Sequence, residues 1–247
     1  MANRVDLEPA YVLHRREYRD TSFLVDAWTL NYGKVALVAR GARGSTRRFP
    51  SLQPFQRFLM SWSGRGELAT LKSCETDGLA YQLTGPLAIS GFYLNELLAY
   101  LLHKYDPNPH LFELYEQALI KLAYLKPSEL DTSYEEQRIL RIFEKRLLEC
   151  LGYGIHFEHD IEAGEEIVAT QWYYYDVENG FHIADKQAKN AFLGENLLSY
   201  GREELNNQGV LKDAKRLMRM TLDYHLDGKQ LKSRELRLAM ELEKREH

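Results

Sequence analysis

Arginine and glycine dominate the stretch from Val35 to Phe58, which reads VALVARGARGSTRRFPSLQPFQRF. Residues 27–66 contain no Asp or Glu, yet they contain seven bases: Lys34, Arg40, Arg43, Arg47, Arg48, Arg57 and Arg65. Guanidinium and ammonium groups bind phosphates through charge and donated hydrogen bonds, without needing a fixed register. A surface that is merely solvated ordinarily mixes both signs of charge. The acid-free interval therefore predicts a phosphate-binding surface.

A second group of bases follows Gly209. Their spacing of i, i+3, i+4 and i+7 places them on one face of an expected helix. They are Lys212, Lys215, Arg216 and Arg219. We expect a second nucleic-acid surface here. An ordinary solvated face is an equally open alternative, because Asp213 and Asp223 weaken the positive field.

A third basic stripe consists of Arg138, Arg141 and Lys145, at i, i+3 and i+7 of another expected helix. It borders apolar residues such as Ile142. A basic stripe beside an apolar groove suits an acidic peptide that ends in a hydrophobic residue. Local pairing with neighbouring glutamates is the competing interpretation.

Enzyme motifs are missing from the sequence. It has no G-x-x-x-x-G-K-[ST] loop for ATP and no G-x-S-x-G nucleophile elbow. His156, His159 and His182 are candidate metal ligands together with Cys150, but structural zinc sites use closely paired ligands and no C-x-x-C occurs. We therefore expect no catalytic residues, no metal and no cofactor.

The first third of the chain has the composition of β-strands. Runs rich in β-branched and aromatic residues are separated by turn chemistry, and they cover residues 11–18, 22–30, 34–40, 55–62 and 67–73. Short strands in about 70 residues suit a small closed barrel, because closure removes exposed edges. The pattern favours a five-stranded OB-fold barrel, with an SH3-like barrel as the near alternative.

Helical periodicity replaces the strand pattern after Asp77. Helices are expected over residues 87–104, 111–124, 133–151, 209–226 and 233–244, with an irregular insertion around 155–185 that contains a short hairpin. The fold class is thus α+β, with an OB-fold nucleic-acid-binding domain at 1–79 and a mainly helical domain at 80–247.

Bulk composition is that of an ordinary globular protein, with 45% hydrophobic residues and a net charge of −4. The charge is uneven: bases exceed acids in residues 1–79 and 205–247, and acids exceed bases between them. The N-terminus lacks the apolar core of a signal peptide, and the most apolar run, residues 86–102, includes Asn95 and Glu96. We expect a cytoplasmic, nucleoid-associated protein that does not enter membranes.

Several segments, in order along nearly the whole chain, resemble the RecO family of bacterial recombination mediators. They are YVLHRREYRDTSFLVDAWT (11–29), GKVALVARGAR (33–43), LQPF (52–55), GRGEL-x-TLK (64–72), Y-x-NELL (93–98), LGYG (151–154) and GK-x-LKSREL (228–236). The resemblance implies an N-terminal OB-fold on a helical domain and a non-catalytic role in DNA repair.

The resemblance also implies specific partners. Such proteins bind single- and double-stranded DNA, anneal complementary strands and engage the acidic tail of single-strand-binding protein, and with RecR they help to load RecA. Many relatives carry a four-cysteine zinc module after the GYG segment, whereas this chain has no cysteine beyond Cys150. From the residues alone, an RNA-binding or translation-associated OB protein and a metal-dependent hydrolase stay open as alternatives.

Overall fold

The structure is a computed structural model that describes residues 4–43, 49–64, 66–126, 132–159 and 164–246. The chain forms two compact units. Unit 1 comprises Met1–Pro127 and Leu231–His247, and unit 2 comprises Ser128–Gln230. Unit 1 thus contains the strands of the first third together with helices from both ends of the remaining sequence. The boundary expected between residues 79 and 80 stays a prediction about independent folding.

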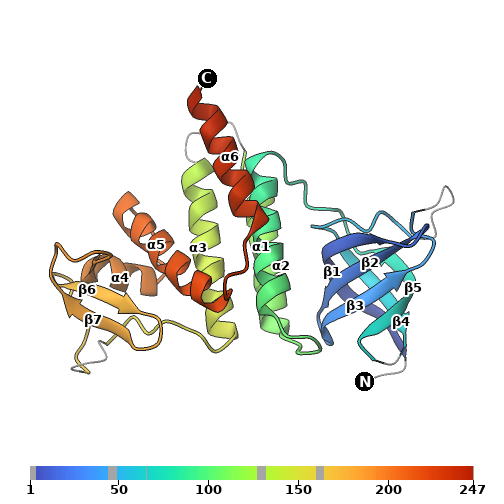
Figure 1. Cartoon of the computed structure of the whole chain (residues 1–247), viewed down its shortest axis with the longest axis horizontal. Helices are drawn as coiled ribbons and strands as arrows, with labels where there is room; N and C mark the ends of the chain where they lie inside the picture. The colour runs from blue at the N-terminus through green and yellow to red at the C-terminus, as the bar shows by residue number, and fades with distance from the viewer. Residues whose placement is uncertain (1–3, 44–48, 65, 127–131, 160–163, 247) are drawn as a thin grey trace. The chain divides into compact units, whose positions relative to one another are not determined.

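Unit 1 contains a closed barrel (Figure 1). Its strands are β1 (Arg4–Tyr18), β2 (Ser22–Thr29), β3 (Gly33–Ala39), β4 (Arg57–Ser63) and β5 (Leu68–Thr76). Their order around the barrel is β1-β2-β3-β5-β4, with β1 also paired to β4 and with β3 parallel to β5. This closed arrangement of five strands confirms the OB-like expectation.

The long strand β1 serves both sides of the barrel because bulges bend it. Its register shifts between Val5 and Glu8 against β4, and between Val12 and His14 against β2. A bulge inserts an extra residue and sharpens the local twist. Inward-facing side chains such as Val12, Leu37 and Met60 fill the interior and are fully buried. Because side chains alternate along each strand, the remaining side chains point out of the barrel, where they contact helices or solvent.

The helices of unit 1 are α1 (Pro86–Leu101), α2 (Pro109–Tyr124) and α6 (Lys232–Glu246). Helix α2 begins where Asn108 accepts a hydrogen bond from Leu111 N at 2.9 Å, with Pro109 at the first position. Aromatic rings join this helix to the barrel, since Phe112 lies 5.2 Å from Tyr11 and 5.3 Å from Trp28. The barrel and its helices thus share a buried aromatic layer.

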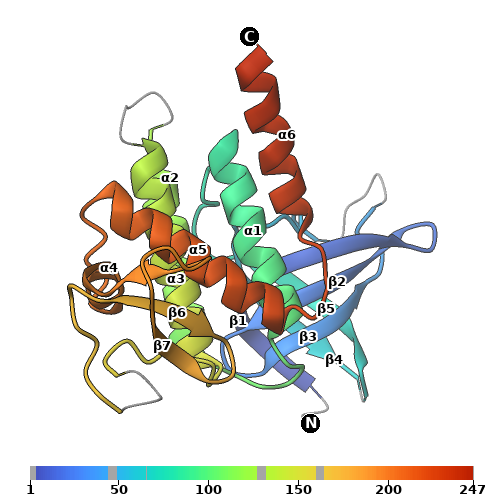
Figure 2. The ribbon, with the colours of Figure 1, turned by 60° about the vertical axis from the view of Figure 1, so that its left-hand side comes forward.

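Unit 2 contains α3 (Thr132–Cys150), α4 (Gly194–Gly201), α5 (Gln208–His225) and a small sheet. The sheet has the order β7-β6-β8, with β6 at Trp172–Asp176, β7 at Gly180–Ala184 and β8 at Phe192–Leu193. Figure 2 shows β6 beside β7. The hairpin expected within residues 155–185 is β6 with β7. One face of the sheet is covered, because Tyr173, Phe181 and Phe192 are each at most 1% exposed.

Candidate nucleic-acid interface

Exposed arginines gather at the turn between β1 and β2. Arg15 and Arg16 lie opposite Val25 and Leu24 in the register of the two strands, and Arg19 lies in the turn that follows. All three arginines are exposed. The guanidinium of Arg15 stands 5.0 Å from the centroid of the Phe23 ring. An aromatic face attracts a cation and orients it without neutralising its charge.

The segment after β3 joins this turn. Arg43 N donates to Thr21 O at 3.0 Å, and a guanidinium nitrogen of Arg43 donates to Arg19 O at 3.1 Å. Arg43 also lies 6.0 Å from the Phe23 centroid, and Arg40 is exposed nearby in sequence. The backbone contacts bring two distant stretches of sequence together. We call this end of the barrel the hairpin patch; its members are Arg15, Arg16, Arg19, Arg40 and Arg43, and Arg15 and Arg16 lie on opposite faces of β1.

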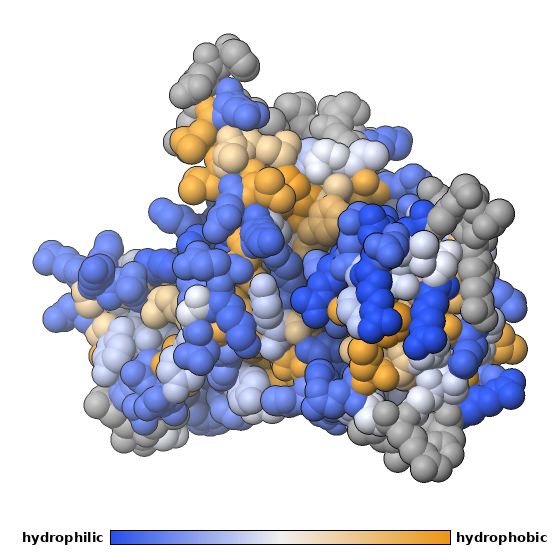
Figure 3. Space-filling model, turned by 45° about the vertical axis from the view of Figure 1, so that its right-hand side comes forward, coloured by the Kyte–Doolittle hydropathy of each residue, from blue (hydrophilic) through white to orange (hydrophobic). Residues whose placement is uncertain are grey.

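Acidic groups limit the positive field of the hairpin patch. Glu17 pairs with Arg43 at 2.8 Å, and Asp20 is exposed in the turn itself. Figure 3 shows strongly hydrophilic residues on the barrel in that view, interspersed with hydrophobic ones. The bases of the patch still outnumber these two acids, so the surface is cationic. Guanidinium groups on such a surface bind backbone phosphates irrespective of base sequence.

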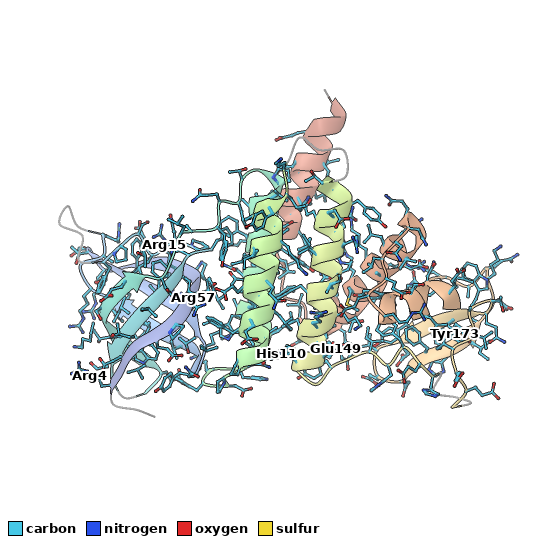
Figure 4. All side chains as sticks on the ribbon, turned by 180° about the vertical axis from the view of Figure 1, so that it is seen from behind. Arg4, Arg15, Arg57, His110, Glu149 and Tyr173 are labelled. Atoms are coloured by element: carbon cyan, nitrogen blue, oxygen red, sulfur yellow. The ribbon has the colours of Figure 1, made fainter. Side chains whose placement is uncertain are left out.

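Two other bases of the acid-free interval turn inward instead. The ammonium group of Lys34 donates to Ala99 O at 2.5 Å. Arg57 pairs with Asp77 at 2.9 Å and with Glu116 at 3.1 Å, on the side of the barrel that faces α2 (Figure 4). The predicted roles of Arg47, Arg48 and Arg65 fall on residues outside the described part of the chain. The assignment of all five to DNA binding stays a prediction.

Glu116 favours the charged form of Arg57. Burial alone would lower the pKa of Arg57, but the hydrogen bond and the charge of Glu116 outweigh burial and raise it. The same carboxylate accepts a hydrogen bond from Tyr11 at 2.6 Å, and burial together with that bond raises the pKa of the Tyr11 hydroxyl. This cluster joins the barrel to α2.

The aromatic residues near the basic interval mostly belong to the core. Trp28, Phe49 and Phe55 are buried, whereas Tyr32 is 37% exposed and meets Trp62 edge-on at 5.6 Å. Packing therefore accounts for most of these rings. Tyr32 is the member of this group that a base reaches without rearrangement.

A cavity of about 320 Å³ opens at the start of β1, between β1, β4 and β5. Arg4, Ser61, Trp62 and Lys72 are among its lining residues. Both β1 and β5 have a bulge opposite the same part of β4, and Lys72 is the inserted residue of β5. In the bulge of β1, Leu7 has a positive φ of 50°. Figure 4 places Arg4 and Arg15 toward opposite ends of the barrel. The hydroxyl of Ser61 and the ammonium group of Lys72 are groups that bind an oxyanion. The carboxylate of Asp6 already pairs with Arg4 at 3.0 Å and would compete with such a ligand.

The basic stripe of α5 is only partly open. Lys212, Lys215 and Arg219 are exposed, and Arg219 lies 3.6 Å from Asp223. Arg216 instead stacks 4.1 Å from the Phe192 centroid and pairs with Asp213 at 3.0 Å. The side chain of Asn207 caps the start of this helix by accepting a hydrogen bond from Val210 N at 2.9 Å. Its role in nucleic-acid binding stays a prediction.

The basic stripe of α3 is enclosed by the chain's own acids. Arg141 is 6% exposed and pairs with Glu144, while Lys145 is 9% exposed and lies 2.9 Å from Glu149. Arg138 pairs with Glu135 at 2.9 Å on the same helix. An acidic peptide has to displace these carboxylates to reach the stripe, so the tail-binding assignment stays a prediction.

The histidine segment does not assemble around a common point. His156 and His159 are exposed, whereas His182 is buried and stacks on Tyr174. Within the described residues, no group of three or more His, Cys, Asp or Glu is arranged to hold a metal ion. The same described residues include no helix that is long and apolar enough to cross a membrane.

Sequence reasoning missed Arg15, Arg16 and Arg19 as candidate site residues. They were overlooked because Glu17 and Asp20 interrupt them, so the local charge looks balanced. The signal was the hairpin itself, since a tight turn after Tyr18 brings this end of β1 beside the residues that follow β3.

These features define a class: an OB-like barrel with a cationic surface, packed on helices. The N-terminal family model of Recombination protein O matches residues 4–78, and the C-terminal model matches residues 86–235. The DNA repair protein RecO of Nitrosococcus oceani is 43% identical over 236 residues, covering 94% of this chain and 93% of that protein. The RecO protein of Coxiella burnetii is 41% identical over 238 residues, covering 96% and 99%. The chain belongs to the RecO family of DNA repair proteins.

Proposed function

We propose that this chain binds single- and double-stranded DNA without catalysis, and that the hairpin patch is its principal DNA contact. The observation that carries the proposal is the convergence of exposed arginines from β1, the β1–β2 turn and the residues after β3. Backbone phosphates satisfy such a surface in any sequence.

Annealing follows from the same electrostatics. Two complementary strands repel each other through their phosphates, and a cationic surface that binds both lowers this repulsion and raises their local concentration. The step needs no ATP and breaks no covalent bond. Together with RecR, such a complex helps to load RecA onto DNA that is covered by single-strand-binding protein, at the nucleoid. Membership of the RecO family supports these roles and partners.

Salt dependence tests the contact. If about five phosphates of a single strand are neutralised, log K falls against log salt with a slope near −3.5. Affinity that does not change with salt would contradict the proposal. Competition between single-stranded DNA and RNA of matched sequence then separates a repair protein from an RNA-binding OB protein, because charge alone discriminates little between them.

Charge reversal and charge removal test the location of the DNA contact. Replacing Arg43, Arg47 and Arg48 by Glu, and separately Arg16 and Arg40 by Gln, is expected to weaken DNA binding strongly in folded protein. Arg202→Gln is the matched control, because Arg202 is a half-exposed arginine of unit 2 that pairs with Glu204. Unchanged affinity in both barrel variants would move the contact elsewhere.

For the acidic tail of single-strand-binding protein, the proposed site is the α3 stripe of Arg138, Arg141 and Lys145. The peptide carboxylates would replace Glu135, Glu144 and Glu149 as the partners of these bases. Titration of a labelled tail peptide against Arg138→Ala and Arg141→Ala tests this exchange. Wild-type affinity in both folded variants would reject the assignment.

A further inference from the structure

Aromatic side chains lie on the second face of the small sheet of unit 2. Along β6, Tyr173 and Tyr175 point into the core and are buried. Trp172 and Tyr174 alternate with them, and Trp172 is half-buried while Tyr174 is 41% exposed. This alternation is the signature of a strand with one covered and one open face. We call Trp172, Tyr174 and His182 the aromatic face; His182 is buried at 9% exposure, and Tyr174 is its exposed member.

The rings of the aromatic face are already arranged for stacking. Tyr174 lies directly opposite His182 in the register, with ring centroids 4.7 Å apart and an interplanar angle of 9°. Trp172 lies on the same side of β6, about 7 Å away along the strand. It is opposite Ala184 on β7 and Leu193 on β8, which are smaller than the indole.

Positive charge accompanies these rings. Lys186 places its ammonium group 5.8 Å from the centroid of the Trp172 ring. Lys189 follows in the same connection between β7 and β8 and is exposed. Asp185 is the one acid among residues 184–191, so the connection carries a net positive charge. Aromatic rings beside lysines match a ligand with planar bases and an anionic backbone.

We propose that the aromatic face is a second nucleic-acid site, which takes unpaired bases of a single strand. A base stacks on Tyr174 and extends the Tyr174–His182 stack, a second base contacts Trp172, and the backbone phosphates pair with Lys186 and Lys189. Base faces inside a duplex are occupied by their neighbours, so the site discriminates in favour of single strands. This inference rests on the proposed nucleic-acid function but uses residues far in sequence from the hairpin patch.

The test compares variants of the full chain at fixed salt, with a 12-nucleotide oligo-dT and a blunt duplex as probes. Tyr174→Ala is expected to weaken oligo-dT binding at least about fivefold, the smallest loss expected for one base stack. Duplex binding should not change. Tyr174→Phe retains the ring and should retain the affinity. Ile183→Ala is the local control, because Ile183 is the exposed neighbour of His182 on β7.

Fluorescence supplies a second readout. Oligo-dT is expected to quench tryptophan emission in the wild type and to lose most of that effect in Trp172→Phe. Equal oligo-dT affinity for Tyr174→Ala and the wild type would overturn the inference. Quenching by a proline-rich peptide in the absence of quenching by oligo-dT would also overturn it, in favour of a peptide site.

The outcomes separate this site from the barrel. If Arg16→Gln with Arg40→Gln weakens DNA binding and Tyr174→Ala does not, the barrel proposal stands and the aromatic face is rejected. If Tyr174→Ala weakens binding and the barrel variant does not, the hairpin patch is rejected and the aromatic face stands.

Discussion

The guanidinium of Arg57 donates hydrogen bonds to both carboxylate oxygens of Glu116, at 3.1 and 3.2 Å, and this contact joins strand β4 to helix α2. Tyr11 donates to the same carboxylate, and Asp77 takes the remaining side of the guanidinium. A base of the acid-free interval is thus engaged by two acids of unit 1. Arg57 lies within an acid-free stretch of sequence, but the fold brings two acids to it from other stretches.

The variant Arg57→Gln is therefore expected to act on stability. Removing the guanidinium leaves the half-buried carboxylates of Glu116 and Asp77 without their charged partner, which should cost about 1–3 kcal/mol of unfolding free energy. Arg40→Gln should have almost no such effect, because Arg40 is exposed. Urea denaturation measures the loss of unfolding free energy, which should be larger for Arg57→Gln. DNA titration of the folded proteins should show the larger loss of affinity for Arg40→Gln. A loss of DNA affinity in folded Arg57→Gln equal to that in Arg40→Gln would contradict the assignment.

The pairing of Glu17 with Arg43 predicts a gain of function. Glu17 holds this guanidinium at 2.8 Å and competes with any phosphate for it. The change Glu17→Gln should raise DNA affinity about two- to fivefold at low salt, since an exposed ion pair is worth less than about 1 kcal/mol. Glu67→Gln removes the same charge from an exposed barrel residue that pairs with Lys104, and it is the control. Equal gains in both variants would show a general charge effect and not a competition at Arg43.

Gly33 should tolerate no side chain. Its φ is 66°, and a Cβ atom would lie 2.5 Å from the backbone nitrogen and oxygen of Asp106. We expect Gly33→Ala to destabilise unit 1 by more than the roughly 1–3 kcal/mol that backbone strain costs. Gly66→Ala isolates the strain, because Gly66 also has a positive φ, of 94°, but has nothing within 4 Å of the added atom. Thermal denaturation that ranks the two variants equally would exclude the clash.

The OB-like barrel was predictable from the sequence because its signals are local. Alternating apolar residues and turn-forming dipeptides are read within ten residues, and the five expected strands match β1 to β5 in order. Strand β1 begins at Arg4 and not near Tyr11, because its first part depends on pairing with β4, far along the chain. Local patterns carry no information about such a partner.

Residues of the motifs that resemble the RecO family make hydrogen bonds that hold elements of unit 1 together. Asn95 donates to Val12 O and Leu13 O, and so ties α1 to the barrel. Glu96 accepts hydrogen bonds from Lys232 N at 3.1 Å and Ser233 N at 3.0 Å, and so holds the start of α6. Family membership was therefore readable from fold-determining residues. The site was harder to predict, because which bases stay exposed depends on acids that other elements bring near them.

The last prediction concerns pH and Glu203 in unit 2. Burial alone would raise the pKa of Glu203, but the hydrogen bond and charge of Arg146, together with Lys145, outweigh it and lower the pKa below its ordinary value of 4.5. A lowered folded-state pKa stabilises the native state above the unfolded pKa, and this stabilisation is lost as pH falls through the folded value. Glu203→Gln should thus lose about 1–3 kcal/mol of unfolding free energy at pH 7, and the difference from the wild type should shrink below pH 4.5. Urea denaturation followed by circular dichroism across this range measures the difference. Glu204→Gln is the control, because its ion pair with Arg202 is half-exposed and is worth less than about 1 kcal/mol. A difference for Glu203→Gln that stays constant from pH 7 into the acid range would show that the variant acts through packing and not through the charge.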